Sequence, residues 1–364
     1  MVIEKIETFL VRLPLHKPFI TGFGEINTKE TVIVKISSKK NAGWGEASTL
    51  SAPIYNHESV HSVISFIKSH AAPLLTGRLI SSPSELHTIL KPFVGNNIAK
   101  AGLDFAVYDL FSRERNVSLA KLIGGNKKFI EVGGDSIGIE DDLNNILRKI
   151  EIQINSGRRR IKLKIKPGHD LLPLSKIREY FPRIDLMVDA NGSYDYSLHK
   201  DVLCELDNYN LLMLEQPFPA NAIYQHSLLA AEMKTPICLD ESITDLTSAR
   251  EAILSKACRI VNIKPGRVGG LTATVEINKY LQEHNIKCWC GGMLETSIGR
   301  AFNIAAASLA NFDYPADISK YDHYFEDICK EEIFPIINSR IEVQHHFKPS
   351  LVKASKRFDK IVSR

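Results

Sequence analysis

The chain has 364 residues, which is too long for one ordinary hydrophobic core, so we expect two domains or one large barrel with additions. Its 44% hydrophobic and 24% charged residues exclude a mostly disordered or fibrous protein. The net charge of +4, from 46 basic and 42 acidic residues, is too small over this length to indicate a nucleic-acid partner.

The N-terminus and the cysteines indicate a soluble protein of the cytoplasm. Glu4 interrupts what would be the apolar core of a signal peptide, and no apolar run of about 18 residues occurs, so no membrane partner is expected. The six cysteines lack the paired spacing of a metal site, and we expect them to be reduced thiols. They are Cys204, Cys238, Cys258, Cys288, Cys290 and Cys329.

The first 125 residues predict an α+β domain. Residues 3–13 are apolar at many alternate positions and are expected to form a strand that stops at Pro14, and residues 31–36 form a β-branched run. From His57 onward, and again over residues 99–111, apolar residues recur every three or four positions, which predicts helices. Strands followed by helices favour the α+β class, and the glycines at 124 and 125 mark a boundary.

Beyond residue 130, short apolar strands alternate with helical stretches. The six strands are expected over residues 160–165, 185–188, 211–214, 236–239, 259–263 and 286–290. Their polar end residues are Lys164, Asp189, Glu215, Asp240, Lys264 and Cys290, separated by 25, 26, 25, 24 and 26 residues. Each interval suits one strand, one loop and one helix, so the pattern predicts parallel strands with crossover helices.

Two further segments bring the strand number to about eight. Residues 132–136 precede the six strands, and a weaker segment over 311–317 follows them. We therefore predict an α/β protein with a (β/α)8-type TIM barrel over residues 126–320. An open doubly wound sheet is disfavoured because no Gly-x-Gly-x-x-Gly motif follows any strand. The active site of such a barrel lies at the C-terminal ends of its strands.

Three carboxylates end consecutive strands. Asp189, Glu215 and Asp240 are expected to converge, because neighbouring strands lie about 4.8 Å apart. Two like charges at 4 Å repel by about 4 kcal/mol at an effective dielectric constant of 20, and a divalent cation removes this repulsion. All-oxygen ligands favour Mg²⁺, with Mn²⁺ as a substitute. The alternative is three unrelated acids that begin helices.

Six of the nine residues over 158–166 are basic, which invites a nucleic-acid interpretation. Strict alternation argues against it, because Lys162, Lys164 and Lys166 share the face of the strand that points into the barrel. Lys264 ends the strand on the opposite side. Lysines near other cations have lowered pKa values and can act as bases. The pattern therefore suits abstraction of a proton beside a substrate carboxylate.

These motifs resemble the enolase superfamily, muconate-lactonising subgroup. The resemblance rests on Lys162-Leu163-Lys164, Asp189-Ala190-Asn191, Glu215-Gln216-Pro217, Asp240-Glu241-Ser242 and Asn262-Ile263-Lys264-Pro265, which occur in order. It implies a modified (β/α)7β barrel, an N-terminal capping domain over residues 1–125, and a C-terminal segment, residues 321–364, that packs back on the capping domain. That segment departs from the family, because residues 345–364 replace a glycine-rich ending with a basic one.

The resemblance also implies roles for individual residues. Asp189, Glu215 and Asp240 would bind Mg²⁺, with Glu241 and Arg267 supporting them, and Lys162, Lys164 and Lys264 would be catalytic. Contacts to a small carboxylate substrate are expected from Thr21, Ser136, Asn191, Gly292 and Met293.

Segments in both predicted domains narrow the activity. Residues 21–24, 43–46, 135–138, 291–296 and 315–319 are similar to those of o-succinylbenzoate synthases and N-succinylamino acid (N-acylamino acid) racemases. The resemblance implies syn dehydration in menaquinone biosynthesis first and racemisation second, with a dipeptide epimerase or a muconate cycloisomerase-like enzyme as further alternatives. A homo-oligomer is expected.

Overall fold

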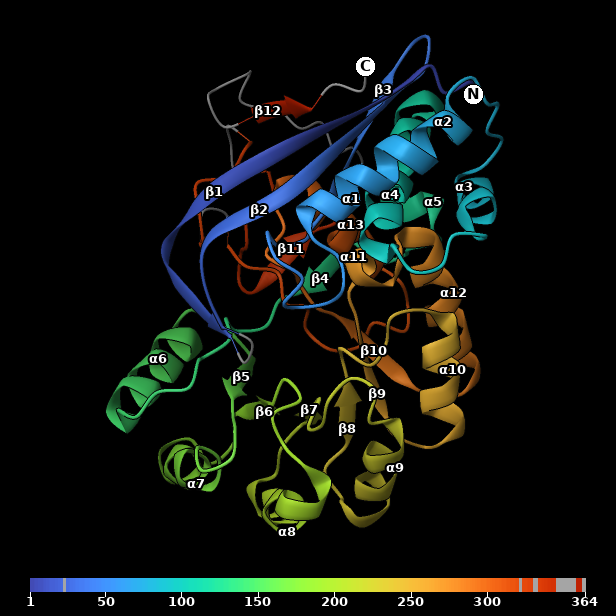
Figure 1. The fold of residues 1–364 in the computed structure, drawn as a ribbon. Helices are drawn as coiled ribbons and strands as arrows, with labels where there is room; N and C mark the ends of the chain where they lie inside the picture. The colour runs from blue at the N-terminus through green and yellow to red at the C-terminus, as the bar shows by residue number, and fades with distance from the viewer. Residues whose placement is uncertain (22–23, 321–322, 330–332, 345–357, 362–364) are drawn as a thin grey trace.

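The computed structural model describes residues 1–21, 24–320, 323–329, 333–344 and 358–361. It is an α/β protein in which an antiparallel sheet with flanking helices sits above a parallel barrel, as Figure 1 shows. The chain runs through the upper layer first and then through the barrel. The pocket described below lies between the two layers.

The capping sheet has the strand order β12-β1-β2-β3. Its strands are β1 (Lys5–Thr21), β2 (Gly24–Ser37), β3 (Ala42–Ala47) and β12 (Phe358–Ile361). The prediction that the first strand stops at Pro14 is wrong, because β1 continues to Thr21. The pairing of β1 with β2 shifts register between Pro14 and Phe19, and such an irregularity accommodates a residue that has no N–H to donate. Near the C-terminus, β12 pairs with β1, while residues 345–357 and 362–364 lie outside the described ranges.

The helices of the capping layer pack on one face of this sheet (Figure 1). They are α1 (Val60–Phe66), a π-helical turn (Ile67–Ala71), α2 (Ala72–Leu75), α3 (Pro83–Leu90), α4 (Asn97–Arg115) and α5 (Leu119–Leu122). Two glycines of β3 let α4 approach closely. A Cβ atom on Gly43 would lie 2.1 Å from the Ala106 carbonyl oxygen, and one on Gly45 would lie 2.2 Å from that of Gly102. The motif Gly43-Trp44-Gly45 is thus explained by packing.

The barrel is a six-stranded parallel sheet of order β10-β9-β8-β7-β6-β5. The strands are β5 (Arg160–Lys164), β6 (Asp185–Asp189), β7 (Leu214–Glu215), β8 (Ile237–Leu239), β9 (Ile260–Ile263) and β10 (Lys287–Cys290). Helix α6 (Leu143–Asn155) precedes these strands. The helices between and after them are α7 (Leu171–Tyr180), α8 (Tyr196–Glu205), a 3-10 turn (Leu206–Tyr209), α9 (Ile223–Glu232), α10 (Leu246–Leu254), α11 (Pro265–Val268), α12 (Leu271–Glu283) and α13 (Ser297–Ala307).

Isolated bridges close this sheet into a barrel. Ile137 pairs with Leu163 of β5, Phe312 pairs with Cys288 of β10, and Val132 pairs with Ala316, all in the parallel sense. The segments expected as the first and eighth strands therefore contribute bridges and no full ladder. The adjacent strands β4 (Phe129–Glu131) and β11 (Arg340–Glu342) instead form a separate antiparallel pair.

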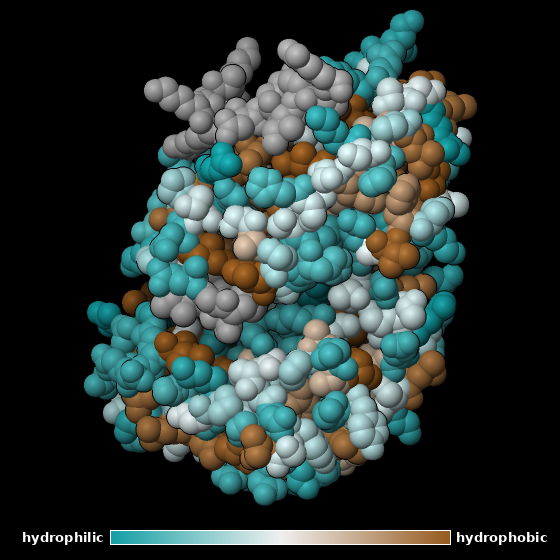
Figure 2. All heavy atoms as spheres, viewed as in Figure 1, coloured by the Kyte–Doolittle hydropathy of each residue, from teal (hydrophilic) through white to brown (hydrophobic). Residues whose placement is uncertain are grey.

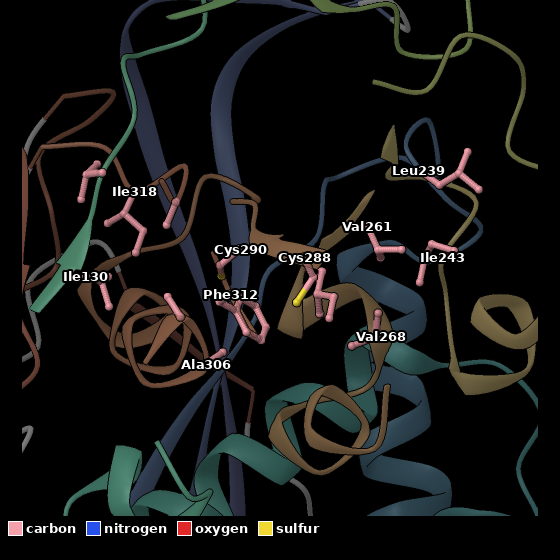
Figure 3. Packing of buried hydrophobic residues seen from close by; sticks show 14 of the residues in the cluster. Ile130, Leu239, Ile243, Val261, Val268, Cys288, Cys290, Ala306, Phe312 and Ile318 are labelled. Carbon is pink, nitrogen blue, oxygen red and sulfur yellow. The ribbon is translucent and has the colours of Figure 1, made fainter. Parts of the chain in front are cut away.

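The main hydrophobic core lies between the barrel strands and their helices. Figure 3 shows part of it, with Cys288, Cys290 and Phe312 gathered beside one another. All three side chains are at most 3% exposed. All six cysteines are free thiols, and five are buried, so they serve as small apolar side chains here.

Buried carboxylates of the capping domain join it to the barrel. Glu46 of β3 accepts hydrogen bonds from the backbone N–H groups of Thr296 and Gly299 at the start of α13. Asp104 of α4 accepts from Leu271 N and Thr272 Oγ1 at the start of α12. Burial raises the pKa of Asp104 to about 7, which these hydrogen bonds oppose. The capping domain is thus seated on the N-terminal ends of two barrel helices.

The surface carries hydrophobic residues in small separate groups among hydrophilic ones, as Figure 2 shows for one face. Among the described residues, no helix is both long enough and apolar enough to cross a membrane.

The buried imidazole of His226 predicts a pH dependence of stability. His226 Nε2 accepts from Phe218 N, and Nδ1 contacts the Ala222 carbonyl oxygen at 2.8 Å. Burial lowers the pKa of His226 to about 4, below the value of about 6.5 expected in the unfolded chain. The unfolded chain therefore binds the proton first, so this contribution is complete above pH 6.5 and is lost as the pH falls towards 4.

We expect His226→Gln to remove about 2 kcal/mol of the loss in unfolding free energy between pH 7 and pH 5. Urea unfolding at pH 7, 6 and 5 measures this, with the exposed His284→Gln as the matched control. An unchanged pH slope in His226→Gln would contradict the assignment.

Candidate active site

A pocket of about 170 Å³ lies between the capping domain and the C-terminal ends of the barrel strands. The capping domain contributes Lys29 from β2 and Tyr55 from the loop that follows β3. The barrel contributes Lys162 and Lys164 of β5, Asp189 of β6, Lys264 after β9, and residues of the loop between β10 and α13. The pocket is therefore complete only when both layers are in place.

Lys162 is buried among carboxylates. Its Nζ lies 2.9 Å from Asp189 Oδ2, 2.7 Å from Glu215 Oε2 and 3.3 Å from Asp317 Oδ2. Burial alone would lower the pKa of Lys162, but these acids together raise it well above the usual value. Lys162 is consequently a fixed cation and cannot serve as a base in this arrangement.

Lys164 lies two residues further along the same strand and is nearer the pocket opening. Its side chain is 20% exposed, against 6% for Lys162. Nζ of Lys164 lies 2.6 Å from Asp189 Oδ2 and also donates to Asn191 Oδ1. Lys166, the third lysine of this face by sequence, is exposed and lies beyond the end of β5.

Lys264 directly follows β9, four strands away from β5 in the sheet, and reaches the same pocket from there. Its Nζ lies 2.8 Å from Asp240 Oδ2 and 3.3 Å from Tyr55 Oη. The expectation of a lowered pKa for this lysine is wrong: burial is the largest single effect and lowers the pKa, but Asp240 together with Tyr55 and Glu241 raises it above the usual value. Arg267 also pairs with Asp240, and the two cations hold the pKa of that acid below its usual range against the effect of burial.

Of the three strand-end acids, Glu215 has the fewest cationic side chains beside it: among the described residues Lys162 alone pairs with it, whereas two cations pair with each of the others. Burial, followed by the charge of Asp189, raises the pKa of Glu215 to about 8. Its Oε1 accepts from Asn262 Nδ2 at 2.8 Å, whereas Oε2 is buried and accepts no well-aligned hydrogen bond, although Lys162 Nζ is close. A further cation beside Glu215 would stabilise its ionised form.

The three carboxylates suit a divalent cation by their chemistry. They supply oxygen ligands only, and one oxygen is an unsatisfied buried acceptor. Within the described ranges, however, no three His, Cys, Asp or Glu side chains are gathered closely enough to hold a metal as they stand. The reason is that Asp189 and Glu215 face Lys162, while Asp240 faces Lys264 and Arg267.

The other residues singled out by sequence are distributed around this centre. Ser136, Asn191, Gly292 and Met293 line the pocket. Glu241 also lines it and accepts from Asn191 Nδ2 at 2.9 Å. Thr21 ends β1, and its side chain lies outside the described part of the chain.

Sequence reasoning missed residues that position these groups. Gln216 is fully buried, and its Oε1 accepts from the backbone N–H groups of Asp240 and Ser242, which fixes the end of β8. Asn262 holds Glu215, and Tyr55 contacts Lys264 from the capping domain. Gln216 and Asn262 stand inside recognised motifs, and this position is the one signal by which sequence could have found them.

Lys29 was also missed, and it joins the capping domain to the pocket wall. Its buried Nζ donates to Ser48 Oγ at 2.8 Å, to the Thr49 carbonyl at 2.9 Å and to the Met293 carbonyl at 3.1 Å. Ser48 Oγ donates to the same Met293 carbonyl at 2.8 Å. The next residue, Leu294, has a φ of 58°, which is unfavourable for leucine and is maintained by surrounding contacts.

Comparison with known proteins agrees with this architecture. Residues 4–124 match the N-terminal domain of mandelate racemase / muconate lactonizing enzymes, and residues 146–349 match the enolase C-terminal domain-like family. The chain belongs to the enolase superfamily.

Individual members of the enolase superfamily are similar over most of their length. The o-succinylbenzoate synthase of Bacillus subtilis (strain 168) is 42% identical over 91% of this chain and 89% of its own. The N-succinylamino acid racemase of Thermus thermophilus is 37% identical over 91% of this chain and 89% of its own. The crystal structure of a superfamily member of unknown function from Enterococcus faecalis V583 has a TM-score of 0.93 at 37% identity, covering both chains completely. The predicted family and barrel fold are confirmed.

The Lys29 contacts predict that the capping domain orders the loop between β10 and α13. We expect Lys29→Met to raise amide hydrogen exchange over residues 291–296 about tenfold or more, because a hydrogen bond from a charged donor contributes about 1.5–3 kcal/mol. Exchange followed by mass spectrometry measures this.

Lys100→Met is the matched control for that experiment, because Lys100 donates to the Phe93 carbonyl within the capping domain. Faster exchange over 291–296 in both variants, or in neither, would contradict a specific role for Lys29.

Proposed function

We propose that the chain is an o-succinylbenzoate synthase. It would catalyse the Mg²⁺-dependent syn dehydration of 2-succinyl-6-hydroxy-2,4-cyclohexadiene-1-carboxylate through an enediolate, a step of menaquinone biosynthesis. The observation that carries the proposal is that Lys164 and Lys264 open into one pocket beside the strand-end carboxylates. The similarity to o-succinylbenzoate synthases over about nine-tenths of the chain supports it.

In this proposal the metal is held by Asp189, Glu215 and Asp240. Members of the enolase superfamily generally use Mg²⁺, and the oxygen-only ligand set and the unsatisfied Glu215 Oε2 support the same ion here. Mn²⁺ would substitute. When bound, the ion supplies positive charge that stabilises the enediolate of the substrate.

Lys164 takes the proton next to the substrate carboxylate. It is the more exposed of the two lysines on β5, and its neighbour Lys162 remains a fixed ammonium that contacts the substrate carboxylate. Lys264 stays protonated beside Asp240 and stabilises negative charge on the opposite face of the substrate. Asn191, Gly292 and Met293 line the space in which that substrate lies, and Glu241 and Arg267 orient the charged groups.

A second candidate is racemisation of N-succinylamino acids, with Lys164 and Lys264 acting alternately on the two faces. The similarity to N-succinylamino acid racemases supports this activity in the same pocket. We rank dehydration first because the o-succinylbenzoate synthase of Bacillus subtilis is 42% identical to this chain, against 37% for the racemase of Thermus thermophilus. A dipeptide epimerase or a muconate cycloisomerase-like enzyme ranks behind both. An epimerase needs an acid that can hold the α-ammonium group of a dipeptide, and Asp317 of the pocket wall is already paired with Arg160 and Lys162.

The proposed setting is the cytoplasm, where the six free thiols would remain reduced. The partner is a small carboxylate, with neither nucleic acid nor membrane involved, and the chain would work as a homo-oligomer.

A paired assay with Mg²⁺ tests the function. One arm follows the ultraviolet loss of the cyclohexadiene substrate, and the other follows α-proton exchange of N-succinyl amino acids in D₂O by NMR. Fast dehydration supports the synthase, exchange without dehydration replaces it with the racemase, and silence in both arms refutes both.

Replacement of the base should stop both reactions. We expect Lys164→Ala to lower turnover in both arms by at least about 1,000-fold while Mg²⁺ binding stays measurable by calorimetry. The exposed Lys166→Ala is the matched control. Turnover near the wild-type rate in Lys164→Ala would refute the base assignment.

Removal of a carboxylate should weaken metal binding directly. We expect Asp189→Asn to weaken Mg²⁺ binding, measured by isothermal titration, at least about tenfold. Exposed Asp195→Asn serves as the control, since Asp195 only begins α8. Equal Mg²⁺ affinity in the two variants would exclude Asp189 from the metal site.

A further inference from the structure

Around one part of the pocket lie two buried hydrogen-bond donors without a partner among the described residues, and an arginine that makes a single ion pair. Arg300 and Asn303 lie one turn apart on α13, and Ser136 lies between Val132 and Ile137, the bridging residues of the segment that closes the barrel. Asn303 Nδ2 and Ser136 Oγ are buried without a hydrogen-bond partner. All three residues line the pocket.

Arg300 is the charged member of this wall. The residue is 5% exposed, and within the described ranges its guanidinium makes one ion pair, with Asp327 Oδ2 at 3.7 Å from Nη1, and no hydrogen bond. Asp327 is itself engaged at the start of α13, where its carboxylate accepts from the backbone N–H groups of Ser297 and Cys329. The guanidinium therefore keeps donor capacity directed at the pocket.

Asp317 and Asp135, two of the acids that line the same pocket, have other partners, and within the described ranges no ion pair joins Arg300 to Glu295, which also lines it. Asp317 pairs with Arg160 and Lys162, and Asp135 lies 3.8 Å from His323 Nδ1. A buried donor without a partner costs about 1–3 kcal/mol, more when it is charged. Two such donors beside a guanidinium that makes a single ion pair are most simply explained by an acceptor that arrives with the ligand.

The geometry points to a binding subsite for a second carboxylate of the substrate, formed by Arg300, Asn303 and Ser136. A guanidinium presents paired donors that match the two oxygens of a carboxylate, and an amide and a hydroxyl add single donors beside it. This inference rests on the proposed function, in which the reacting carboxylate lies at the lysines of β5. It assigns the terminal carboxylate of the succinyl arm, which both candidate substrates carry, to these three residues.

Equilibrium binding tests the subsite without requiring turnover. The probes are N-succinylglycine and its terminal amide, which have the same length and differ in the charge of the arm, and glycine has no stereocentre to racemise. Isothermal titration with Mg²⁺ present should show the wild-type protein binding the succinyl compound roughly 10–100-fold more tightly than the amide. In Arg300→Met the preference should fall to within about threefold, with amide binding nearly unchanged.

The matched control is Arg178→Met, because Arg178 donates to backbone carbonyls of Tyr209 and Ile184, away from the pocket. Asn303→Asp is a second variant of nearly equal size, which keeps the test decisive if Arg300→Met does not fold. Its new negative charge should abolish or reverse the preference for the succinyl compound.

Two results would overturn the subsite: a wild-type protein without preference for the carboxylate, or a preference that survives in the folded variants. Equal weakening of both probes would show that Arg300 has a structural role only. A clear preference without turnover in the paired assay would refute the proposed function and leave the subsite standing. Turnover without a preference for the carboxylate would refute the subsite and leave the proposed function standing.

Discussion

The burial of several carboxylates at one end of the barrel is the constraint on which the rest of the site depends. Asp189, Glu215 and Asp240 are each at most 1% exposed, and isolated charges at such positions would be strongly unfavourable. The protein compensates with cations from β5, from the end of β9 and from α11. Lys162 lies between Asp189 and Glu215, and Lys264 and Arg267 hold Asp240. The proposed catalytic lysines and the proposed metal ligands therefore form one electrostatic unit.

The capping domain is needed to complete that unit. Tyr55 contacts Lys264 and Arg267, and Lys29 donates a hydrogen bond to the carbonyl of Met293 in the loop between β10 and α13. The domain is itself held by Glu46 and Asp104, whose carboxylates satisfy the first N–H groups of α13 and α12. Helix α13 thus serves two purposes, because it receives the capping domain at its start and presents Arg300 and Asn303 to the pocket one turn later.

Much of the fold could be predicted because strand spacing is a local property. The near-constant separation of strand ends predicted six parallel strands, and β5 to β10 lie within two or three residues of their predicted ranges. The first and eighth strands were harder, since they are held by single bridges such as Val132 with Ala316 and have no extended ladder to impose a strong alternation. Pro14 misled because a proline ends most strands, whereas β1 tolerates it where the register shifts.

The sequence by itself determined the superfamily, the order of the strands and the identity of the charged residues at their ends, because residue spacing and short motifs are local features that a sequence shows directly. Only the tertiary structure decided what those charges do to one another. The pKa of Lys264 is raised and not lowered because Asp240 lies 2.8 Å away, a distance that no spacing reveals. Likewise Lys29 and Tyr55 lie far from the barrel motifs in the sequence, and they reach the pocket only because the capping domain packs over the barrel.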